Sequence, residues 1–360
     1  TCLMFLDKAG AETCHFTKVD DLDAWRIDGK GTQGDIPADK ITAAEWNFIV
    51  GEGASLFERL SKMPVKLGDI AEQIFVGLQT SADTVFLFKE FTQDKAGTTE
   101  VVSAELGESV LLESAILKRV IRSGSIGRYC ATTTAMVLFP YEVQDSKARL
   151  YTQKEMHERF PLAWAYLTRN HELLAGREKG KFKGERWYCF GRTQNLGAWE
   201  QPKLMIPYMI QDLAAYLDRE DDFYFVNVTT GGFGVTINEV TGSLEYVCAL
   251  LNSKPLDFYL KQVASTFHGG YFAANKQYIE QLPIRPIDFG NPEDKVRHDE
   301  IVHLVKDAHA LHRRLVLVKS PPEKESLKRQ IRAIESQIDS LVCELYGIGP
   351  DEMRQNPLRA

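Results

Sequence analysis

The 360-residue sequence lacks the features of membrane proteins and of disulfide-stabilised proteins. No apolar run approaches the roughly 20 residues needed to cross a bilayer, and the opening TCLMFL has neither a basic leader nor a cleavage site. The six cysteines form no CxxC pair and have apolar or aromatic neighbours, which predicts buried free thiols. We therefore expect a soluble, cytoplasmic protein of two or three structural units, since domains usually have about 100–200 residues.

Residue patterns for catalysis are also missing. The nearest glycine-rich stretch, Gly231-Gly232-Phe233-Gly234, lies inside a β pattern and predicts a turn, not a cofactor loop. Ser320-Pro321-Pro322 imitates the catalytic motif of DNA amino-methyltransferases, but Glu323 follows where an aromatic ring must stack on the flipped base. Glu293-Asp294-Lys295 has the composition of a nuclease triplet but lies in a polar linker. The sequence therefore predicts no catalytic residue and no bound cofactor.

A metal site is not expected either. Four histidines crowd one predicted helix, but their spacing does not place them on one face, and no cysteine or acid completes a ligand shell. They are His298, His303, His309 and His312.

Acidic residues are absent from one segment and scarce in another. Residues 114–141 contain four basic residues and no acid, and residues 177–192 contain six basic residues and two acids. The net charge of −7 is unusual for a nucleic-acid-binding protein, but clustered cations can still neutralise phosphates. The distribution of charge therefore favours two basic surfaces on an acidic protein.

The spacing of apolar residues predicts an α+β fold with mixed, mostly antiparallel sheets, helices and a C-terminal antiparallel helical hairpin. The expected elements are two short strands around a turn at Gly10, a helix over 35–62, a hairpin of strands at 75–78 and 84–88, helices over 153–177 and 244–264, and strands within 222–237 joined at 229–232. Apolar stripes over 301–318 and 327–345, separated by Ser320-Pro321-Pro322-Glu323, predict the two long helices of the hairpin.

Three segments have residue types suited to DNA. The stretch LKRVIRSGSIGRY, residues 117–129, predicts a helix with basic residues outward; a solvated helix end is the alternative. GREKGKFKGERWYCFGR, residues 176–192, predicts a flexible basic loop before a strand with Trp187 and Tyr188; a solubilising loop is the alternative. Residues 267–276 combine two glycines with side chains that can bond base edges, although an ordinary turn would look the same. The candidate DNA-binding residues are Lys118, Arg119, Arg122, Arg128, Lys179, Lys181, Lys183, Arg186, Arg192, His268, Tyr271, Asn275 and Lys276.

The order of several segments resembles the TaqI-like C-terminal specificity domain of type II N6-adenine DNA methyltransferases and fused restriction-modification enzymes. These segments are residues 77–86, LKRVIRSGSIGRY, Trp187-Tyr188, PKLMIPYM at 202–209, LNSKPLDFYL to LPI within 251–284, and ESQIDSLVCELYGI at 335–348. The resemblance extends over residues 65–347. It implies a noncatalytic module that recognises a sequence in double-stranded DNA beside an upstream methyltransferase domain. S-adenosylmethionine would then be a cofactor of the parent enzyme, and a nuclease domain could be attached to it.

The resemblance also suggests a division of the chain. Residues 1–45 would be terminal strands of the methyltransferase domain, 46–64 a connecting helix, 65–288 the target-recognition domain, 289–347 the helical hairpin and 348–360 a tail. A free-standing specificity subunit like that of type I systems is one alternative, although such a subunit would show two recognition repeats and we find one. A hydrolase that uses Asp212, Asp218 or His268 is another.

Overall fold

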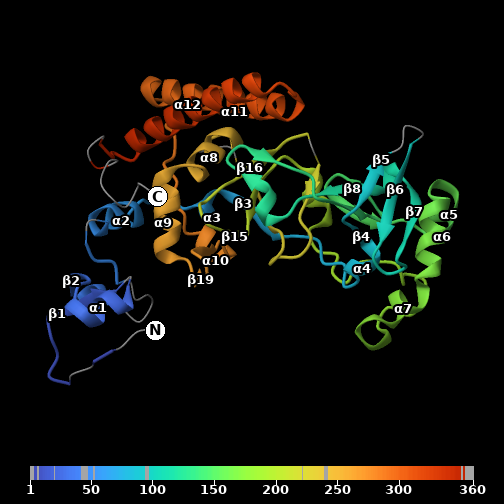
Figure 1. Cartoon of the computed structure of the whole chain (residues 1–360), viewed down its shortest axis with the longest axis horizontal. Helices are drawn as coiled ribbons and strands as arrows, with labels where there is room; N and C mark the ends of the chain where they lie inside the picture. The colour runs from blue at the N-terminus through green and yellow to red at the C-terminus, as the bar shows by residue number, and fades with distance from the viewer. Residues whose placement is uncertain are drawn as a thin grey trace.

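The computed structural model describes residues 4–5, 8–19, 21–41, 48–51, 53–93, 97–220, 222–238, 242–349 and 352. Helices and mostly antiparallel strands alternate irregularly along the chain, and two long helices follow them, as the sequence predicted. Figure 1 shows these two helices, α11 and α12, along one side of the molecule. Strands β5–β7 and helices α5–α7 form one end, and β1, α1 and β2 lie near the other.

A four-stranded antiparallel sheet separates two hydrophobic cores. Its strand order is β16 (Tyr216–Asp218), β14 (Lys203–Pro207), β18 (Gly232–Ile237) and β3 (Ala71–Val76). Alternate side chains of a strand point to opposite faces, so Leu204 and Ile206 enter the first core while Met205 enters the second. The sheet is therefore covered on both faces, which explains why all five residues of β14 are buried.

Helices cover the first core. They are α2 (Ala54–Ser61), α3 (Leu67–Ile70), α8 (Leu244–Leu251), α9 (Lys254–Val263) and α10 (Lys276–Ile279). Every residue of α8 is buried, and the hydroxyl of its N-cap Ser243 accepts from the backbone N–H of Tyr246. The helix predicted over 244–264 is thus confirmed, but it breaks into α8 and α9 at Asn252–Ser253. The new helix begins at Lys254 and has Pro255 in its first turn.

The second core lies between strands and helices at the other end of the molecule. A sheet with the order β17 (Phe223–Tyr224), β8 (Leu117–Val120), β11 (Ala135–Leu138) and β4 (Leu87–Phe88) contributes to it; only its β17–β8 pair is parallel. A second sheet consists of β5 (Phe91–Gln93), β6 (Thr98–Ser103) and β7 (Glu108–Glu113). The helix predicted over 153–177 is present as α5 (Gln153–Arg159), α6 (Pro161–Arg169) and α7 (His171–Gly180).

Short elements connect these layers. The short helical ones are α4 (Asp83–Phe86) and the 3-10 helices η1 (Ala38–Lys40), η2 (Ser114–Ile116), η3 (Ser123–Ser125) and η4 (Leu196–Glu200). The paired strands are β9 (Ile126–Gly127) with β10 (Cys130–Ala131), β12 (Tyr141–Gln144) with β13 (Lys147–Leu150), and β20 (Tyr271–Ala273) with both β15 (Met209–Ile210) and β19 (Thr266–Phe267).

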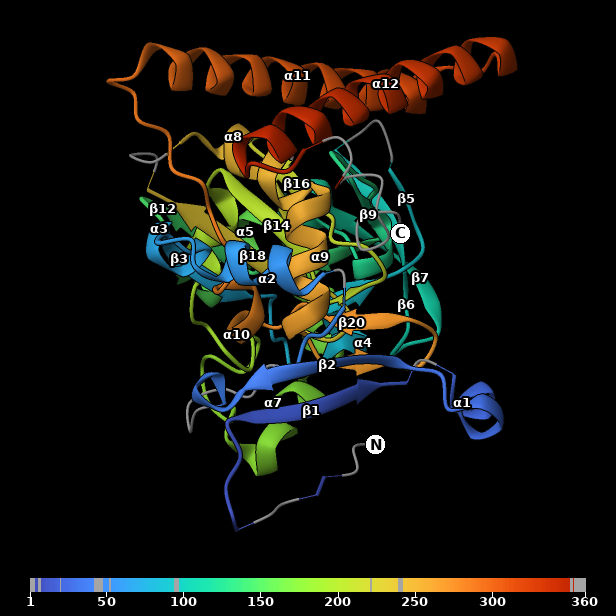
Figure 2. The ribbon, with the colours of Figure 1, turned by 90° about the vertical axis from the view of Figure 1, so that its left-hand side faces the viewer.

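The long helices α11 (Pro292–Leu317) and α12 (Pro321–Leu345) form the predicted antiparallel hairpin. Asn291 caps α11 by accepting from the Glu293 N–H, and Pro321 begins α12. Ile301, Val305 and Ile338 bury their side chains in the first core, so the hairpin packs against the body of the protein. Figure 2 shows both helices running across that body.

Several sequence predictions were wrong in detail. Residues 75–88 do not form a hairpin, because β3 pairs with β18 and β4 pairs with β11. Residues 117–120 form a strand, β8, instead of a helix, although Leu117, Val120 and Ile121 are buried as expected. Residues 187–188 form a turn instead of a strand. The two strands in 222–237 are present but join different sheets.

The N-terminal predictions were partly wrong. The second predicted strand is β1 (Thr13–Lys18), but its partner is β2 (Thr32–Pro37), which overlaps the start of the helix predicted over 35–62. Within that range the described helical residues are η1 and α2, and Trp46 lies outside the described residues. Helix α1 (Leu22–Asp28) between the strands was not predicted.

Among the described residues, none of the helices has the length and apolar character needed to span a bilayer. The five described cysteines are free thiols, and Cys189, Cys248 and Cys343 are buried, whereas Cys14 and Cys130 are half-buried. Cys2 lies outside the described residues.

Candidate nucleic-acid interface

The basic loop, residues 177–192, begins within the last residues assigned to α7 and is fixed to the second core by a buried arginine. The chain leaves helical geometry at Arg177, whose guanidinium lies 4.3 Å from the centre of the Phe182 ring. It donates four hydrogen bonds of 2.7–2.9 Å to the carbonyl oxygens of Leu174, Thr80, Trp187 and Cys189. Burial lowers the pKa of Arg177. This residue was counted among the basic residues of the segment, but its role is to hold both ends of the loop.

The other basic side chains of the loop are exposed. They are Lys179, Lys181, Lys183, Arg186 and Arg192. Glu178 pairs with Arg192 at 2.8 Å and with Lys181 at 3.4 Å, and hydrogen bonding to Arg192 is the main cause that lowers its pKa. Five cations therefore face solvent beside two acids: Glu178, which pairs with two of the cations, and the exposed Glu185. Such a cluster suits the phosphates of a nucleic acid.

The basic residues of 118–128 have mixed environments. Lys118 lies 2.6 Å from the Glu200 carboxylate, and the Arg119 guanidinium stacks over the Phe223 ring at 4.8 Å. Arg128 donates to both carboxylate oxygens of Asp339 on α12, at 3.0 and 3.1 Å. Lys118 and Arg128 are thus paired and mostly buried, with side chains 25% and 27% exposed, whereas those of Lys181 and Arg192 are 65% and 48% exposed. Neither Lys118 nor Arg128 belongs to the DNA-binding set that we propose below.

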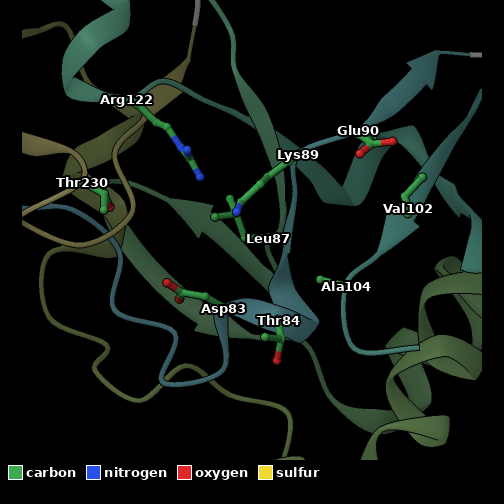
Figure 3. A pocket seen from close by; sticks show the side chains of 9 residues that line it. All are labelled: Asp83, Thr84, Leu87, Lys89, Glu90, Val102, Ala104, Arg122 and Thr230. Atoms are coloured by element: carbon green, nitrogen blue, oxygen red, sulfur yellow. The ribbon is translucent and has the colours of Figure 1, made fainter. Parts of the chain in front are cut away.

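Arg122 is placed differently, because its side chain lines a cavity of about 430 Å³. Figure 3 shows the side chains of Arg122 and Lys89 pointing toward each other across this cavity. Asp83, on the same wall, accepts from the Thr80 hydroxyl at 2.5 Å and from the Asn227 amide at 2.6 Å. These neutral donors leave the negative charge of Asp83 in place, and Glu90 also lines the cavity, so its two cations face two carboxylates. Lys89 was not predicted as a site residue, because it is a single cation directly after the apolar run 85–88.

The predicted segment 267–276 forms an exposed β-hairpin followed by a short helix. Strands β19 and β20 join through His268-Gly269-Gly270, in which both glycines have positive φ, +79° and +75°. Phe267 and Tyr271 face each other in register and remain 48% and 39% exposed. His268 and Lys276 are exposed, whereas Asn275 is half-buried and its side-chain oxygen accepts from the Lys276 N–H in the cap of α10.

Three adjoining hollows connect the basic loop to α10, the short helix that follows the hairpin. The first, about 560 Å³, is lined by Lys181, Lys183 and Arg186 and shares Thr193 with the second, of about 200 Å³. The second shares Gln73 and Asn195 with the third, of about 340 Å³, which reaches Lys276. Helices α7 and α10, which flank this series, both lie away from α11 and α12 (Figures 1 and 2). The fold therefore brings the basic loop and Lys276, the last residue of the segment 267–276, to one series of hollows.

Of the three residues named for the alternative hydrolase, Asp218 and Asp212 form ion pairs with lysines, and His268 is exposed. Asp218 is 1% exposed and accepts from Lys203 at 2.7 Å and from the Phe223 N–H at 2.8 Å. Asp212 pairs with Lys261 at 2.6 Å. In the described part of the chain, histidine, cysteine and acidic side chains do not gather in a group of three or more that could hold a metal ion.

Two comparisons with known proteins agree with this geometry. Residues 158–284 match the TaqI-like C-terminal specificity domain family. The chain is also 23% identical over 370 residues to the type II restriction enzyme and methyltransferase RM.Eco57I of Escherichia coli; the match covers 97% of this chain and 36% of that protein. The chain thus spans about a third of the length of this relative. The family match starts in α5 and ends after α10, so it includes both the basic loop and the hairpin, but not Arg122.

Proposed function

We propose that this chain is the DNA sequence-recognition part of a type II restriction-modification, adenine-specific DNA methyltransferase, and that it is noncatalytic by itself. The observation that carries the proposal is the joint position of the two segments inside the matched specificity domain. Three exposed cations of the basic loop, Lys181, Lys183 and Arg186, and Lys276 after the hairpin border the same series of hollows. Lys179, Lys181, Lys183, Arg186, Arg192 and Lys276 would neutralise phosphates of double-stranded DNA.

In the parent enzyme, a methyltransferase domain would use S-adenosylmethionine. This chain would position the target sequence beside that domain. The glycine-rich stretch of this chain does not fit that cofactor. Gly232 and Gly234 lie inside strand β18, where a Cβ at Gly232 would overlap the Ile206 backbone and one at Gly234 the Phe75 ring. These glycines allow close packing of the sheet and leave no room for a ligand. Our proposal accordingly places the protein in the cytoplasm with DNA, with the catalytic groups in another part of the parent enzyme.

The test is selection of the purified chain against a random duplex library at low salt, followed by binding measured over a range of salt concentrations. We expect a short enriched motif and a steep salt dependence. In a variant with Lys179→Gly, Lys181→Ala and Lys183→Ala, the slope of log K against log salt should fall by about one unit for each phosphate that is no longer neutralised. Glycine is chosen at position 179 because the backbone there has a φ of +62°.

The matched control removes the same charge from the opposite side of the molecule. Lys328, Arg329 and Arg332 are exposed on α12, and their replacement by alanine should leave the salt slope unchanged. An equal loss in both triple variants would show that net charge alone governs binding and would remove the loop from the DNA surface. If the unmodified chain binds no duplex at any salt concentration, the proposed function is wrong.

A further inference from the structure

We propose that Gln73 and Asn195 read base edges of the DNA, with a preference for adenine; this inference rests on the proposed function and assigns sequence discrimination to two particular side chains. Both line the second and the third hollow, between the cations of the basic loop and Lys276. Both are exposed, and within the part of the chain that the structure describes neither side chain has a hydrogen-bond partner.

The charges around the two amides distinguish a base-reading site from a phosphate site. The third hollow includes the carboxylates of Glu72 and Glu280 beside Gln73 and Asn195. Lys276 is the one cation that faces these two acids, whereas in the first hollow three cations face Glu185 alone. Since carboxylates repel phosphates, the first hollow suits the DNA backbone better than the third. Base edges in the major groove present amino donors as well as acceptors, which amides and carboxylates can match.

The chemistry of the amide group favours adenine. Asn and Gln side chains can donate to the adenine N7 and accept from its N6 amino group at the same time. Gln201, the third amide at the second hollow, is excluded from this role because its side-chain nitrogen donates to the Ser146 hydroxyl. The two free amides are thus distinguished from the third by their hydrogen bonding.

The backbone at both residues belongs to well-supported elements. Gln73 lies on β3, where it is opposite Thr236 of the adjacent strand β18. Asn195 has a φ of +58° and directly precedes the buried 3-10 helix η4. In that helix, Gly197 lies so close to the Ser146 backbone that a Cβ would overlap it, which locks the segment against the β12–β13 turn. Residues on such supports can place an amide against a base edge with little loss of backbone freedom on binding.

The experiment is the same library selection, carried out with the full chain and with single variants. Gln73→Ala and Asn195→Gly each remove one amide, and glycine at 195 tolerates the positive φ. Each variant should lose the preference for adenine at one position of the enriched motif. Its affinity for the wild-type motif should fall roughly 5- to 150-fold, with an unchanged salt slope. Gln194→Ala is the matched control, because Gln194 is an exposed amide that lines none of the three hollows.

A change of base preference provides a second test. Asn195→Asp keeps the size of the side chain and its tolerance of positive φ but leaves only acceptors, so the preference at that position should change from adenine to cytosine. An unchanged motif in Gln73→Ala and Asn195→Gly, with salt-dependent binding intact, would overturn this inference and leave the proposed function standing. Binding without any enriched motif, or an equal change of the motif in Gln194→Ala, would also overturn it. Absence of DNA binding by the unmodified chain would overturn both.

Discussion

Arg177 and Lys181 belong to the same basic segment, yet their side chains have opposite environments. The Arg177 guanidinium is buried and bonded to four carbonyl oxygens, whereas the Lys181 ammonium is exposed. Sequence alone could not distinguish them, because the acceptors of Arg177 come from Thr80 and from the turn at 187–189 as well as from its own helix. The planar guanidinium with five donors is what makes arginine suitable for such a site.

Replacement of Arg177 by lysine should therefore destabilise the protein although the charge is kept. An ammonium group has three donors and lacks the planar arrangement of a guanidinium. At least one of the four carbonyl oxygens bonded to Arg177 would therefore lose its partner. We expect the free energy of unfolding in urea to fall by about 2–5 kcal/mol. Lys183→Ala in the exposed part of the same loop is the control and should change stability by less than about 0.5 kcal/mol. A stability of Arg177→Lys equal to that of the unmodified chain would contradict the structural role.

At the scale of elements, pairing between distant segments explains most of the wrong predictions. Residues 75–78 and 84–88 have the composition of strands with a turn between them, but β3 pairs with β18 and β4 with β11. Local propensity identifies a strand and does not identify its partner. By contrast, α11 and α12 were predicted well, since an apolar stripe of helical period defines each helix locally.

Strands β18 and β3 of the central sheet approach each other closely at Gly234. A Cβ at Gly234 on β18 would overlap the ring of Phe75 on β3. Gly234→Ala should therefore lower the free energy of unfolding by about 1–3 kcal/mol, which urea denaturation would measure. Gly124→Ala is the control, because a Cβ there meets open space. Adding Phe75→Leu to Gly234→Ala should relieve the overlap, so the double variant should lose less stability than the sum of the two single effects. A double variant that is less stable than the unmodified protein by the full sum would show that the overlap is not the cause.

At the scale of the whole molecule, polar contacts fix the helical hairpin to the recognition region. Arg128 beside β9 forms its bidentate pair with Asp339 on α12, and burial raises the pKa of that carboxyl despite the guanidinium. His312 on α11 lies 3.5 Å from Glu335 on α12. Desolvation lowers the pKa of His312, but the interactions with Cys130 on β10 and with Glu335 outweigh it and raise the pKa to about 9.

This raised pKa predicts a stability that depends on pH. The folded protein holds the proton of His312 more tightly than the unfolded chain, whose histidine has a pKa of about 6.5. The stabilisation is therefore complete below pH 6.5 or so and is lost as the pH rises toward about 9. The free energy of unfolding, measured in urea at several pH values between 6 and 9, should decline for the unmodified chain and decline less for His312→Gln. Arg128, Asp339, Cys130 and Glu335 are retained in both proteins, so parallel curves would exclude His312 as the titrating group.

The sequence by itself determined the α+β class, the long helical hairpin, the two basic segments and the resemblance to the specificity domain that the family match over residues 158–284 supports. These properties depend on composition and on local periodicity, which are present before the chain folds. Only the tertiary structure decided which charges are available. It neutralised Lys118 with Glu200 and Arg128 with Asp339, buried Arg177, and placed Gln73 and Asn195 on one surface with the basic loop. The physical reason is that ion pairing and exposure depend on contacts between residues far apart in the chain, and these contacts are set by the packing of the two cores.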